Sequence, residues 1–408
     1  MARSYYVKGR RLHLDSQPST FNSQPIAPTL HAEFWSSVEY STFGRALAAE
    51  LTQRGLATEH RFERTQREYW AARGRITRWR LRAAAYGIYP LRLLGHFVRA
   101  EPGLVGVVCT NTFYAPTVAL AASPRSTPIV HWVLDLFPDV LTVAGKLRRG
   151  GLGDRALRSM VRWTFQRAAA NVFLGEHLRR YAEVQFGEVP RSVVIPVGAD
   201  GAPFRGTPPQ PSTGPARILY SGNLGRMHDI DTVAAVLRNR PLSPSGAQFH
   251  FRGNGAGFRE LQTKIGGLGA KPRDGVVFGD NLPEAQWREA MLAADIALVT
   301  MKRGAEGLVM PSKTYSALVA GQAILAICPS QSDLADTVRR HQCGWVVEPG
   351  DTGGLSRALD EIEANPAAVL EKRRSAYAAG HSTYDQPVIA AQWERLLRTV
   401  AAEVGPAF

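Results

Sequence analysis

The sequence predicts an α/β protein built from two doubly wound domains, each a parallel sheet covered by helices on both faces. Short apolar runs alternate with helical patterns through most of the chain, which is typical of parallel sheets. A stretch of glycine, proline and small polar residues at 197–215 interrupts the alternation, which then restarts. The length of 408 residues and the apolar content of 45% are sufficient for two to three domains with ordinary cores.

The first half begins with an expected strand at 12–14 and a long loop at 17–37, because residues 17–37 are rich in proline, serine, threonine and asparagine. A helix is expected at 38–54, where apolar residues recur every four positions before Gly55. Further strands are expected at 106–109, 129–134, 171–174 and 192–196, and helices at 115–122 and 139–146.

The second half repeats the alternation more regularly and closes with an amphipathic helix at 387–402. Strands are expected at 218–221, 248–252, 276–278, 296–300, 323–327 and 344–347, and helices at 231–238, 257–265, 284–293, 312–320 and 332–340. We therefore expect a first domain over 1–204, a linker at 205–215, a second domain over 216–385, and a segment 386–408 that packs back across the pair.

Basic residues are concentrated in the first half: the net charge of +14 divides into +12 for 1–204 and +2 for 205–408. Residues 61–100 alone carry ten arginines, two acids and seven aromatic side chains, and Ile76, Trp79, Ala83 and Tyr86 follow helical spacing. Such helices favour an anionic membrane surface, at about 1 kcal/mol per basic group. Two alternatives stay open, a helix pair with core faces and solvated arginines, and a nucleic-acid interface, which no recognised module supports. We expect no nucleic-acid partner.

Metal sites and disulfides are not expected. The three cysteines, Cys109, Cys328 and Cys343, form no CxxC pair, and the ten histidines show no HxxxH spacing. The N-terminus lacks the apolar core of a signal peptide, and no stretch approaches the roughly 18 apolar residues of a spanning helix. We expect a cytoplasmic protein that is peripheral on the inner face of the cell membrane.

Glycine-rich loops follow three strands of the second half. Ligands of doubly wound sheets bind at the carboxyl ends of strands, glycine allows close backbone approach, and an arginine can bind phosphate oxygens. A tight turn explains any single loop equally well. The residues concerned are Gly222, Asn223, Leu224 and Gly225 with Arg226, then Gly253, Asn254 and Gly255, then Phe278 and Gly279.

The segment 303–313 precedes the expected helix at 312–320 and contains Glu306, Pro311, Ser312 and Lys313. Ser312 is expected to cap the helix, whereas a lysine in the first turn opposes the helix dipole. An anion in front of Lys313 removes this conflict, as phosphates do at helix starts. A solvated surface lysine is the alternative, since its cost is only tenths of a kcal/mol.

Together these residues resemble a known family. The sequence resembles the donor domain of retaining GT-B glycosyltransferases of glycosyltransferase family four, and is most similar to the bacterial polysaccharide and colanic-acid-type branch. The resemblance covers about residues 105–400. It rests on the three loops, on Pro311-Ser312-Lys313-Thr314-Tyr315, on Ala320-Gly321, and on Val194-Ile195-Pro196-Val197-Gly198-Ala199-Asp200 with Phe204, which is similar to the family's domain-closing motif.

The resemblance implies a GT-B fold, in which two Rossmann-like domains face each other across a cleft. It implies transfer of a sugar from a nucleoside-diphosphate sugar to a lipid-linked or polysaccharide acceptor, with retention and without a cofactor or bound metal. Arg226 and Lys313 would stabilise the leaving diphosphate, Phe278 and Gly279 would line the base, and Glu306 would meet the hydroxyls of the donor sugar. Ser316 stands where the family places a glutamate that holds the ribose.

Acidic residues allow two further hypotheses. Asp135 follows the expected strand at 129–134 and would orient or deprotonate an acceptor hydroxyl, or it braces the turn before Pro138. Asp229 and Asp231 resemble a metal-binding DxD triplet, but at a helix start they are expected to act as caps. His131, inside the strand, is expected in the core.

Two other function classes remain. One is a sugar-nucleotide epimerase on the same fold, and the other is a non-catalytic protein that binds a charged surface. Product analysis and nucleotide binding distinguish them from a transferase.

Overall fold

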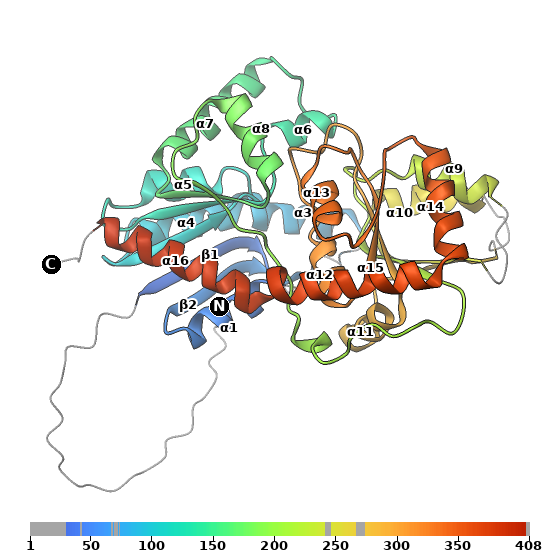
Figure 1. The fold of residues 1–408 in the computed structure, drawn as a ribbon. Helices are drawn as coiled ribbons and strands as arrows, with labels where there is room; N and C mark the ends of the chain where they lie inside the picture. Colours follow the sequence, from blue (N-terminus) through green and yellow to red (C-terminus); the bar gives the residue numbers. More distant parts are fainter. Residues whose placement is uncertain are drawn as a thin grey trace, which may run out of the picture.

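The structure is a computed structural model that describes residues 30–40, 43–66, 68, 72, 74–240, 246–266 and 274–404. It contains two six-stranded parallel sheets, with strand orders β2-β1-β3-β4-β5-β6 and β12-β11-β10-β7-β8-β9. The two sheets belong to two domains that lie side by side (Figure 1). The predicted α/β fold of two doubly wound domains is confirmed.

The first sheet and its helices come from residues before 195. Its strands are β1 (His31–Val38), β2 (Ala57–Arg64), β3 (Leu104–Cys109), β4 (Ile129–Val133), β5 (Ala170–Phe173) and β6 (Ser192–Val194). Its helices are α1 (Gly44–Gln53), α3 (Arg75–Ala83), the π-helix η1 (Ala84–Ile88), α4 (Tyr89–Phe97), α5 (Ala115–Ala122), α6 (Asp139–Val143), α7 (Leu152–Arg167) and α8 (Glu176–Phe186).

The second sheet follows a short 3₁₀ helix, η2 (Ala202–Phe204). Its strands are β7 (Arg217–Asn223), β8 (Gln248–Asn254), β9 (Val276–Gly279), β10 (Ile296–Thr300), β11 (Ala323–Ile327) and β12 (Gly344–Val347). Its helices are α9 (Asp231–Asn239), α10 (Ala256–Gly266), α11 (Glu284–Ala293), α12 (Lys313–Val319), α13 (Asp333–Arg340), α14 (Thr352–Ala364) and α15 (Pro366–Ala379), after which the π-helix η3 (Gly380–Tyr384) leads into α16 (Gln386–Val404).

The prediction of a loop through 17–37 is wrong for residues 31–37, which form β1. This strand lies between β2 and β3, and its six inner residues are buried, so hydrogen bonding on both sides outweighs the weak strand signal of its serines. The helix expected from 38 starts only at Gly44, because Val38 still belongs to β1. β2 was not predicted, since it is a charged edge strand. The strand expected at 12–14 lies outside the described residues.

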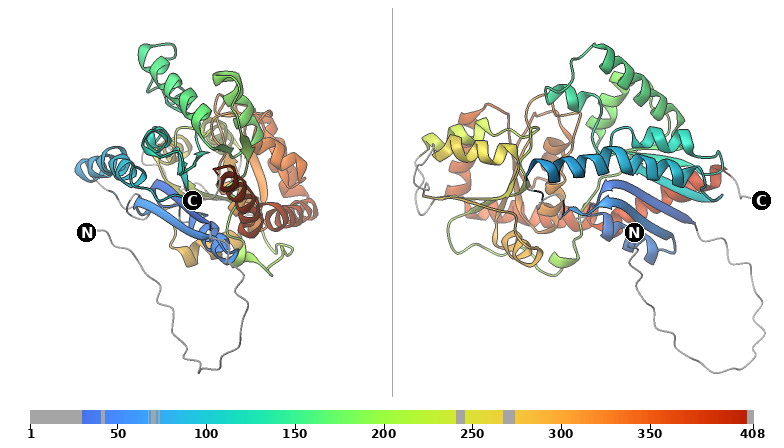
Figure 2. Two further views of the ribbon diagram at one scale, coloured as in Figure 1. Left: turned by 90° about the vertical axis from the view of Figure 1, so that its left-hand side faces the viewer. Right: turned by 180° about the vertical axis from the view of Figure 1, so that it is seen from behind.

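The last helix connects the two domains. α15 and α16 follow one another along a line that runs from the second domain back to the first (Figure 1; Figure 2). Trp393 of α16 is fully buried, and its ring lies edge-on to those of Phe34 and Trp132, at centroid distances of 5.3 and 5.1 Å. α16 therefore completes the core of the first domain.

Direct contacts hold the carboxyl ends of the two sheets together. Asp135, after β4, forms an antiparallel bridge with Val309 of the second domain, and the amide of Leu136 donates to the carbonyl of Leu308 at 3.0 Å. The carboxylate of Asp333, at the start of α13, accepts hydrogen bonds from two amides at the start of α8, those of residues 177 and 178, at 3.0 and 3.2 Å. The ends of both sheets thus face one cleft.

Replacing Trp393 by alanine removes the aromatic contact between α16 and the first domain. We expect Trp393→Ala to lower the free energy of unfolding by about 3–5 kcal/mol, as for other large-to-small core changes. Urea unfolding followed by tryptophan fluorescence and circular dichroism measures this. Arg395→Ala, on the exposed side of the same helix, is the control and should change stability by less than about 0.5 kcal/mol.

Candidate active site

The two glycine-rich loops that end β7 and β8 lie against each other. The strands are parallel neighbours, and Gly222 is paired with Gly253. A Cβ atom at Gly253 would collide with the carbonyl oxygen of Gly222, and one at Gly255 would collide with the side chain of Asn223. Gly222 itself has φ of +116° and open space where a Cβ atom would stand, so a ligand can approach its backbone. Loop packing requires two of these glycines, and Gly222 is the one that faces open space.

The other side chains of the first loop are either buried in the core or exposed to solvent. The side chain of Leu224 is buried in the core of the second domain, and its amide donates to the carbonyl of Asn254 at 2.8 Å. Gly225 and Arg226 follow, and Arg226 is exposed. The glycines, Asn223, which is exposed, and Arg226 of this loop are therefore placed to contact a ligand through backbone or side chain.

The predicted base-binding residues lie at the end of β9. Phe278 stacks on Phe251, at a centroid distance of 4.9 Å and an interplanar angle of 15°, and lies edge-on to Phe258. The guanidinium of Arg252 occupies the space where a Cβ atom of Gly279 would stand. Arg252 was not predicted as a site residue. It follows the apolar part of β8 directly, so extending the search to the last residues of each strand would have found it.

Lys313 is the most unusual residue of this region. Its Nζ donates a hydrogen bond to the hydroxyl of Tyr220 and lies 3.8 Å from the centroid of the Tyr220 ring. Burial lowers the pKa of Lys313 to about 7. His228 lies edge-on to the same ring, and burial and the charge of Lys313 lower its pKa to about 3. Lys313 is therefore not the solvated surface lysine of the alternative interpretation.

The loop before Lys313 carries Glu306, whose Oε2 atom is buried and has no hydrogen-bond partner among the described residues. Pro311 and Ser316 are half-buried, and Ser312 is exposed. The prediction that Ser312 caps α12 is wrong, because its backbone is already helical, with φ of −60°, and its side chain accepts no bond from the helix. The hydroxyl of Ser312 remains accessible.

The acidic triplet after the first glycine loop is structural, as expected for Asp229. Its carboxylate accepts hydrogen bonds from the amide and the hydroxyl of Thr232, both at 2.9 Å, at the start of α9. Asp231 forms an ion pair with Lys264 of α10 at the surface.

Asp135 ends the extension of β4 on the opposite side of the cleft. Its backbone amide donates a hydrogen bond to the Thr110 hydroxyl oxygen at 3.1 Å, while no hydrogen bond of its carboxylate occurs among the described residues. Burial raises the pKa of Asp135 to about 6. Thr110, rather than the Asp135 carboxylate, therefore braces the turn. His131 is buried and paired with Asn171 at 3.1 Å, as expected for a core residue.

Three residues beside Asp135 were not predicted as site residues. Tyr40 follows β1, Cys109 ends β3, and Asn111 comes two residues later. The Cys109 thiol lies 3.3 Å from the Asn111 Oδ1 atom, and the Asn111 Nδ2 atom is buried without a partner among the described residues. Asn111 follows a correctly predicted strand, so the strand-end rule could have found it. Tyr40 was missed because β1 was taken for a loop.

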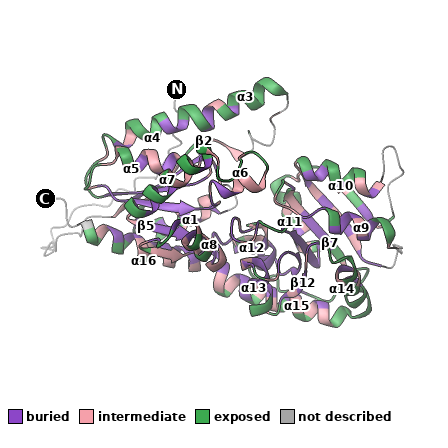
Figure 3. Cartoon of the chain, turned by 90° about the horizontal axis from the view of Figure 1, so that it is seen from above, coloured by how far each residue is buried: buried purple, intermediate pink, exposed green. Residues whose placement is uncertain are grey.

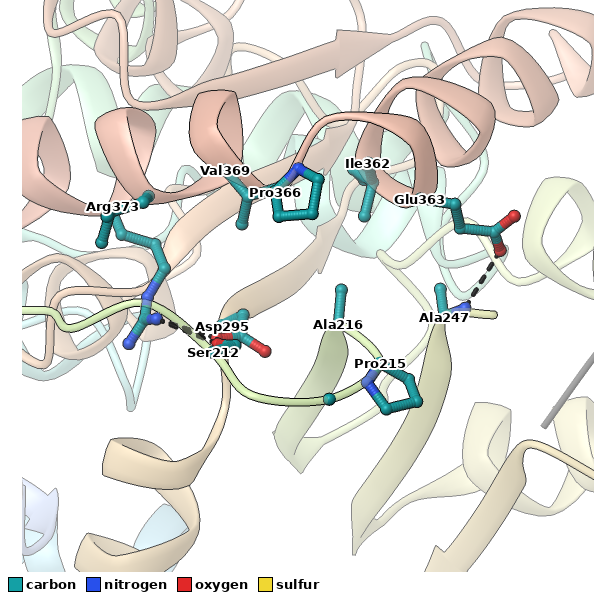
Figure 4. Close-up of a pocket in the computed structure, with 12 residues that line it drawn as sticks. Ser212, Pro215, Ala216, Ala247, Asp295, Ile362, Glu363, Pro366, Val369 and Arg373 are labelled. Atoms are coloured by element: carbon teal, nitrogen blue, oxygen red, sulfur yellow. Dashed lines mark hydrogen bonds and ion pairs between the residues drawn. The ribbon is translucent and has the colours of Figure 1, made fainter. Parts of the chain in front are cut away.

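A cavity of about 330 Å³ lies elsewhere, between the segment 212–216, α14 and α15 (Figure 4). Its polar groups bind one another: Arg373 pairs with Asp295 at 2.8 Å, and Glu363 accepts from the amide of Ala247 at 3.0 Å. This cavity adjoins the amino ends of β7, β8 and β10, whereas ligands of such sheets bind at the carboxyl ends. We therefore assign the active site to the cleft with the glycine-rich loops.

Within the arginine-rich segment 61–100, the described residues form the end of β2 and, from Arg75 onward, a continuous rod of α3, η1 and α4 along the outside of the first domain (Figure 2). One side of the rod joins the core through Leu93 and Phe97. The other side is exposed (Figure 3), and Ile76, Trp79 and Leu91 are 71%, 69% and 68% exposed. The alternative that both apolar faces are core is therefore wrong for this outer side.

Comparison with known proteins identifies the class. Residues 208–382 match the family model of glycosyl transferases group 1. The probable glycosyltransferase WbjE of Pseudomonas aeruginosa is 28% identical over 304 residues, which are 68% of this chain and 73% of WbjE. Sucrose-phosphate synthase from Thermosynechococcus elongatus superimposes with a TM-score of 0.69, at 16% identity, over 91% of this chain and 99% of that one. HepE of Anabaena, in complex with UDP-glucose, gives a TM-score of 0.62 at 14% identity, over 90% and 99% of the two chains.

The fold is thus the GT-B fold, with two Rossmann-like domains. The family match in the second domain and the similarity to WbjE support a glycosyltransferase.

The raised pKa of Asp135 has a consequence for stability. The folded protein binds the Asp135 proton more tightly than the unfolded chain does. The stability that this proton contributes is therefore fully present below about pH 4 and is lost as the pH rises through about 6. We expect Asp135→Asn to raise the free energy of unfolding by about 1–2 kcal/mol at pH 8 and by little at pH 4. Urea unfolding at both pH values measures this, with Asp280→Asn, at an exposed position, as the control. Equal effects at both pH values would contradict the prediction.

Proposed function

We propose that this protein is a retaining, metal-independent hexosyltransferase of glycosyltransferase family four, in the bacterial polysaccharide and colanic-acid-type branch. Its donor is a nucleoside-diphosphate sugar and its acceptor a polysaccharide or a polyprenyl-linked glycan, in the synthesis of cell-surface glycans. The observation that carries the proposal is Lys313, whose amine contacts Tyr220, a residue bonded through its hydroxyl to the glycine-rich loop that ends β7. HepE, which has the same fold, binds UDP-glucose.

Each side of the cleft has a separate task in this reaction. Breaking the bond between the sugar and the diphosphate leaves negative charge on the diphosphate, which Lys313 and the guanidinium of exposed Arg226 stabilise. Fixed charges act most strongly where they are desolvated, and partial burial desolvates Lys313. The buried, unpartnered carboxylate oxygen of Glu306 accepts from hydroxyls of the donor sugar. Phe278 and Gly279 line the base, and Ser316 lies at the position expected beside the ribose.

Asp135 orients the acceptor hydroxyl from the first domain and takes up its proton. Its carboxylate is ionised only above about pH 6, so it can accept a proton at neutral pH. Because Asp135 is bridged through its backbone to Val309, the acceptor side and the donor loop keep a fixed relation.

Loss of either cation should abolish transfer while the fold is retained. We expect Lys313→Ala and Arg226→Ala to lower kcat/KM at least 100-fold, because each removes charge that the transition state needs. Release of nucleoside diphosphate from UDP-, GDP-, dTDP- and ADP-sugars with a membrane extract as acceptor measures this. Arg259→Ala, an exposed arginine on α10, is the control and should keep full activity.

A thermal-shift screen with UDP, GDP, dTDP and ADP identifies the base. A diphosphate at 100 times its dissociation constant stabilises the fold by about 2.7 kcal/mol. Full activity of both alanine variants would disprove the phosphate assignment. Interconversion of the sugar nucleotide without an acceptor would instead indicate the epimerase.

The outer side of α3, η1 and α4 supports a peripheral site of action on the cytoplasmic face of the membrane. Exposed Ile76, Trp79 and Leu91 supply apolar surface that a bilayer interface accepts, and exposed arginines of α3, among them Arg75 and Arg78, supply charge for anionic lipids. No helix within the described part of the chain is both long and apolar enough to span a membrane. A membrane-bound acceptor would then reach the cleft from this side.

Removing the apolar side chains should weaken membrane binding without loss of chemistry. We expect the double change Ile76→Ser and Trp79→Ser to reduce binding to phosphatidylglycerol-containing vesicles at least tenfold, measured by vesicle flotation. Val184→Ser, at a 79% exposed position on α8, is the matched control and should bind as the wild type does. Unchanged binding of the double variant, or preferential binding of RNA over vesicles, would contradict the membrane assignment.

A further inference from the structure

Tyr220 connects Lys313 to the glycine-rich loop. Lys313 donates to the Tyr220 hydroxyl, and this hydroxyl donates in turn to the carbonyl of Asn223 at 2.9 Å. Tyr220 is only 1% exposed, so packing fixes its ring and hydroxyl. The Lys313 amine is therefore held at a fixed place beside the loop whose Gly222 backbone is open.

The groups that face Lys313 supply no compensating negative charge. Among the described residues, Tyr220, from β7, contacts Lys313, and His228, from the segment after β7, lies edge-on to the Tyr220 ring and feels the charge of Lys313. His228 is neutral at pH 7, since burial and the charge of Lys313 lower its pKa to about 3, although its Nδ1 atom lies 2.8 Å from the carbonyl of Thr300. No carboxylate of the described residues forms an ion pair with Lys313. A buried ammonium without an anion is unfavourable, and an arriving anion removes that penalty.

We propose that Tyr220 positions Lys313 for the diphosphate, and that binding of a diphosphate draws a proton from solvent onto the Lys313 amine. The nitrogen lone pair takes up this proton, and no other bond is made or broken. The inference rests on the proposed function and adds a positioning residue and a proton-coupled binding step to it.

The coupling has a defined sign. Burial sets the pKa of free Lys313 to about 7, and a neighbouring diphosphate raises it. We therefore expect the diphosphate to bind most tightly below about pH 7, where Lys313 is already protonated. Above that pH the affinity should fall about tenfold for each pH unit. The terminal phosphate of a nucleoside diphosphate, with a pKa of about 6, is already ionised over this range.

The Tyr220 hydroxyl accepts a hydrogen bond from Lys313, which favours the protonated amine. Tyr220→Phe keeps the ring and removes this acceptor, so the pKa of Lys313 falls further. A hydrogen bond to a charged group corresponds to about tenfold in affinity. We expect Tyr220→Phe to bind a diphosphate about tenfold more weakly at pH 8 and within about threefold of the wild type at pH 6. A purely structural role of Tyr220 would weaken binding equally at both pH values.

Isothermal titration calorimetry with UDP, and in parallel with GDP, dTDP and ADP, tests the inference on the full chain. Titrations at pH 6 to 9 in two buffers of different ionisation enthalpy give the number of protons taken up. The wild type should take up close to one proton at pH 8, and Lys313→Arg, which stays charged, should take up none. Tyr377→Phe loses a hydroxyl that contacts the Phe204 carbonyl away from the site, and should match the wild type.

The outcomes separate the two proposals. Binding without proton uptake at pH 8, or a Tyr220→Phe loss that is the same at pH 6 and pH 8, overturns this inference and leaves the proposed function intact. If none of the four diphosphates binds the wild type, both are overturned.

Discussion

The active site depends on the contact that holds the carboxyl ends of the two sheets together. This contact is made largely by backbone: Asp135 bridges to Val309, and the Leu136 amide binds the Leu308 carbonyl. Backbone hydrogen bonds fix the relation of the two domains without using the side chains of Asp135 or Glu306, which stay free for chemistry. The capping of α8 by Asp333 adds a second fixed point. The loop that leads to Lys313 is therefore positioned by contacts with the first domain as well as by contacts within the second domain, to which it belongs.

Burial shifts two ionisable side chains, Asp135 and Lys313, toward neutrality. The pKa of Asp135 rises to about 6 and the pKa of Lys313 falls to about 7, because both lose solvation. At neutral pH the Asp135 carboxylate can thus still accept a proton and the Lys313 amine can still take one up. Such a pair suits a reaction that moves a proton off an acceptor and builds charge on a diphosphate.

The uneven distribution of charge has a structural counterpart. The second half of the chain has a surplus of only +2, and in the proposed function it binds the diphosphate with a few placed cations such as Lys313 and Arg226. The first half, with +12, exposes its arginines along α3 next to Ile76 and Trp79, on the outside of the fold. The net charge therefore bears on the surface at which the protein acts, whereas a few desolvated charged side chains bear on the reaction.

The sequence by itself determined the alternating fold and the positions of the glycine-rich loops, because buried parallel strands are local apolar runs; 296–300 and 323–327 were predicted to the residue. It did not determine β1, whose serines are buried only by pairing on both sides, or the edge strand β2. Tertiary structure alone brought Tyr220 against Lys313, Arg252 against Gly279, and Tyr40 against Cys109. Local periodicity in the sequence indicates which face of a helix or strand is buried. Contacts between residues 93 positions apart, such as Lys313 and Tyr220, and the desolvation that accompanies them, form only when the chain folds.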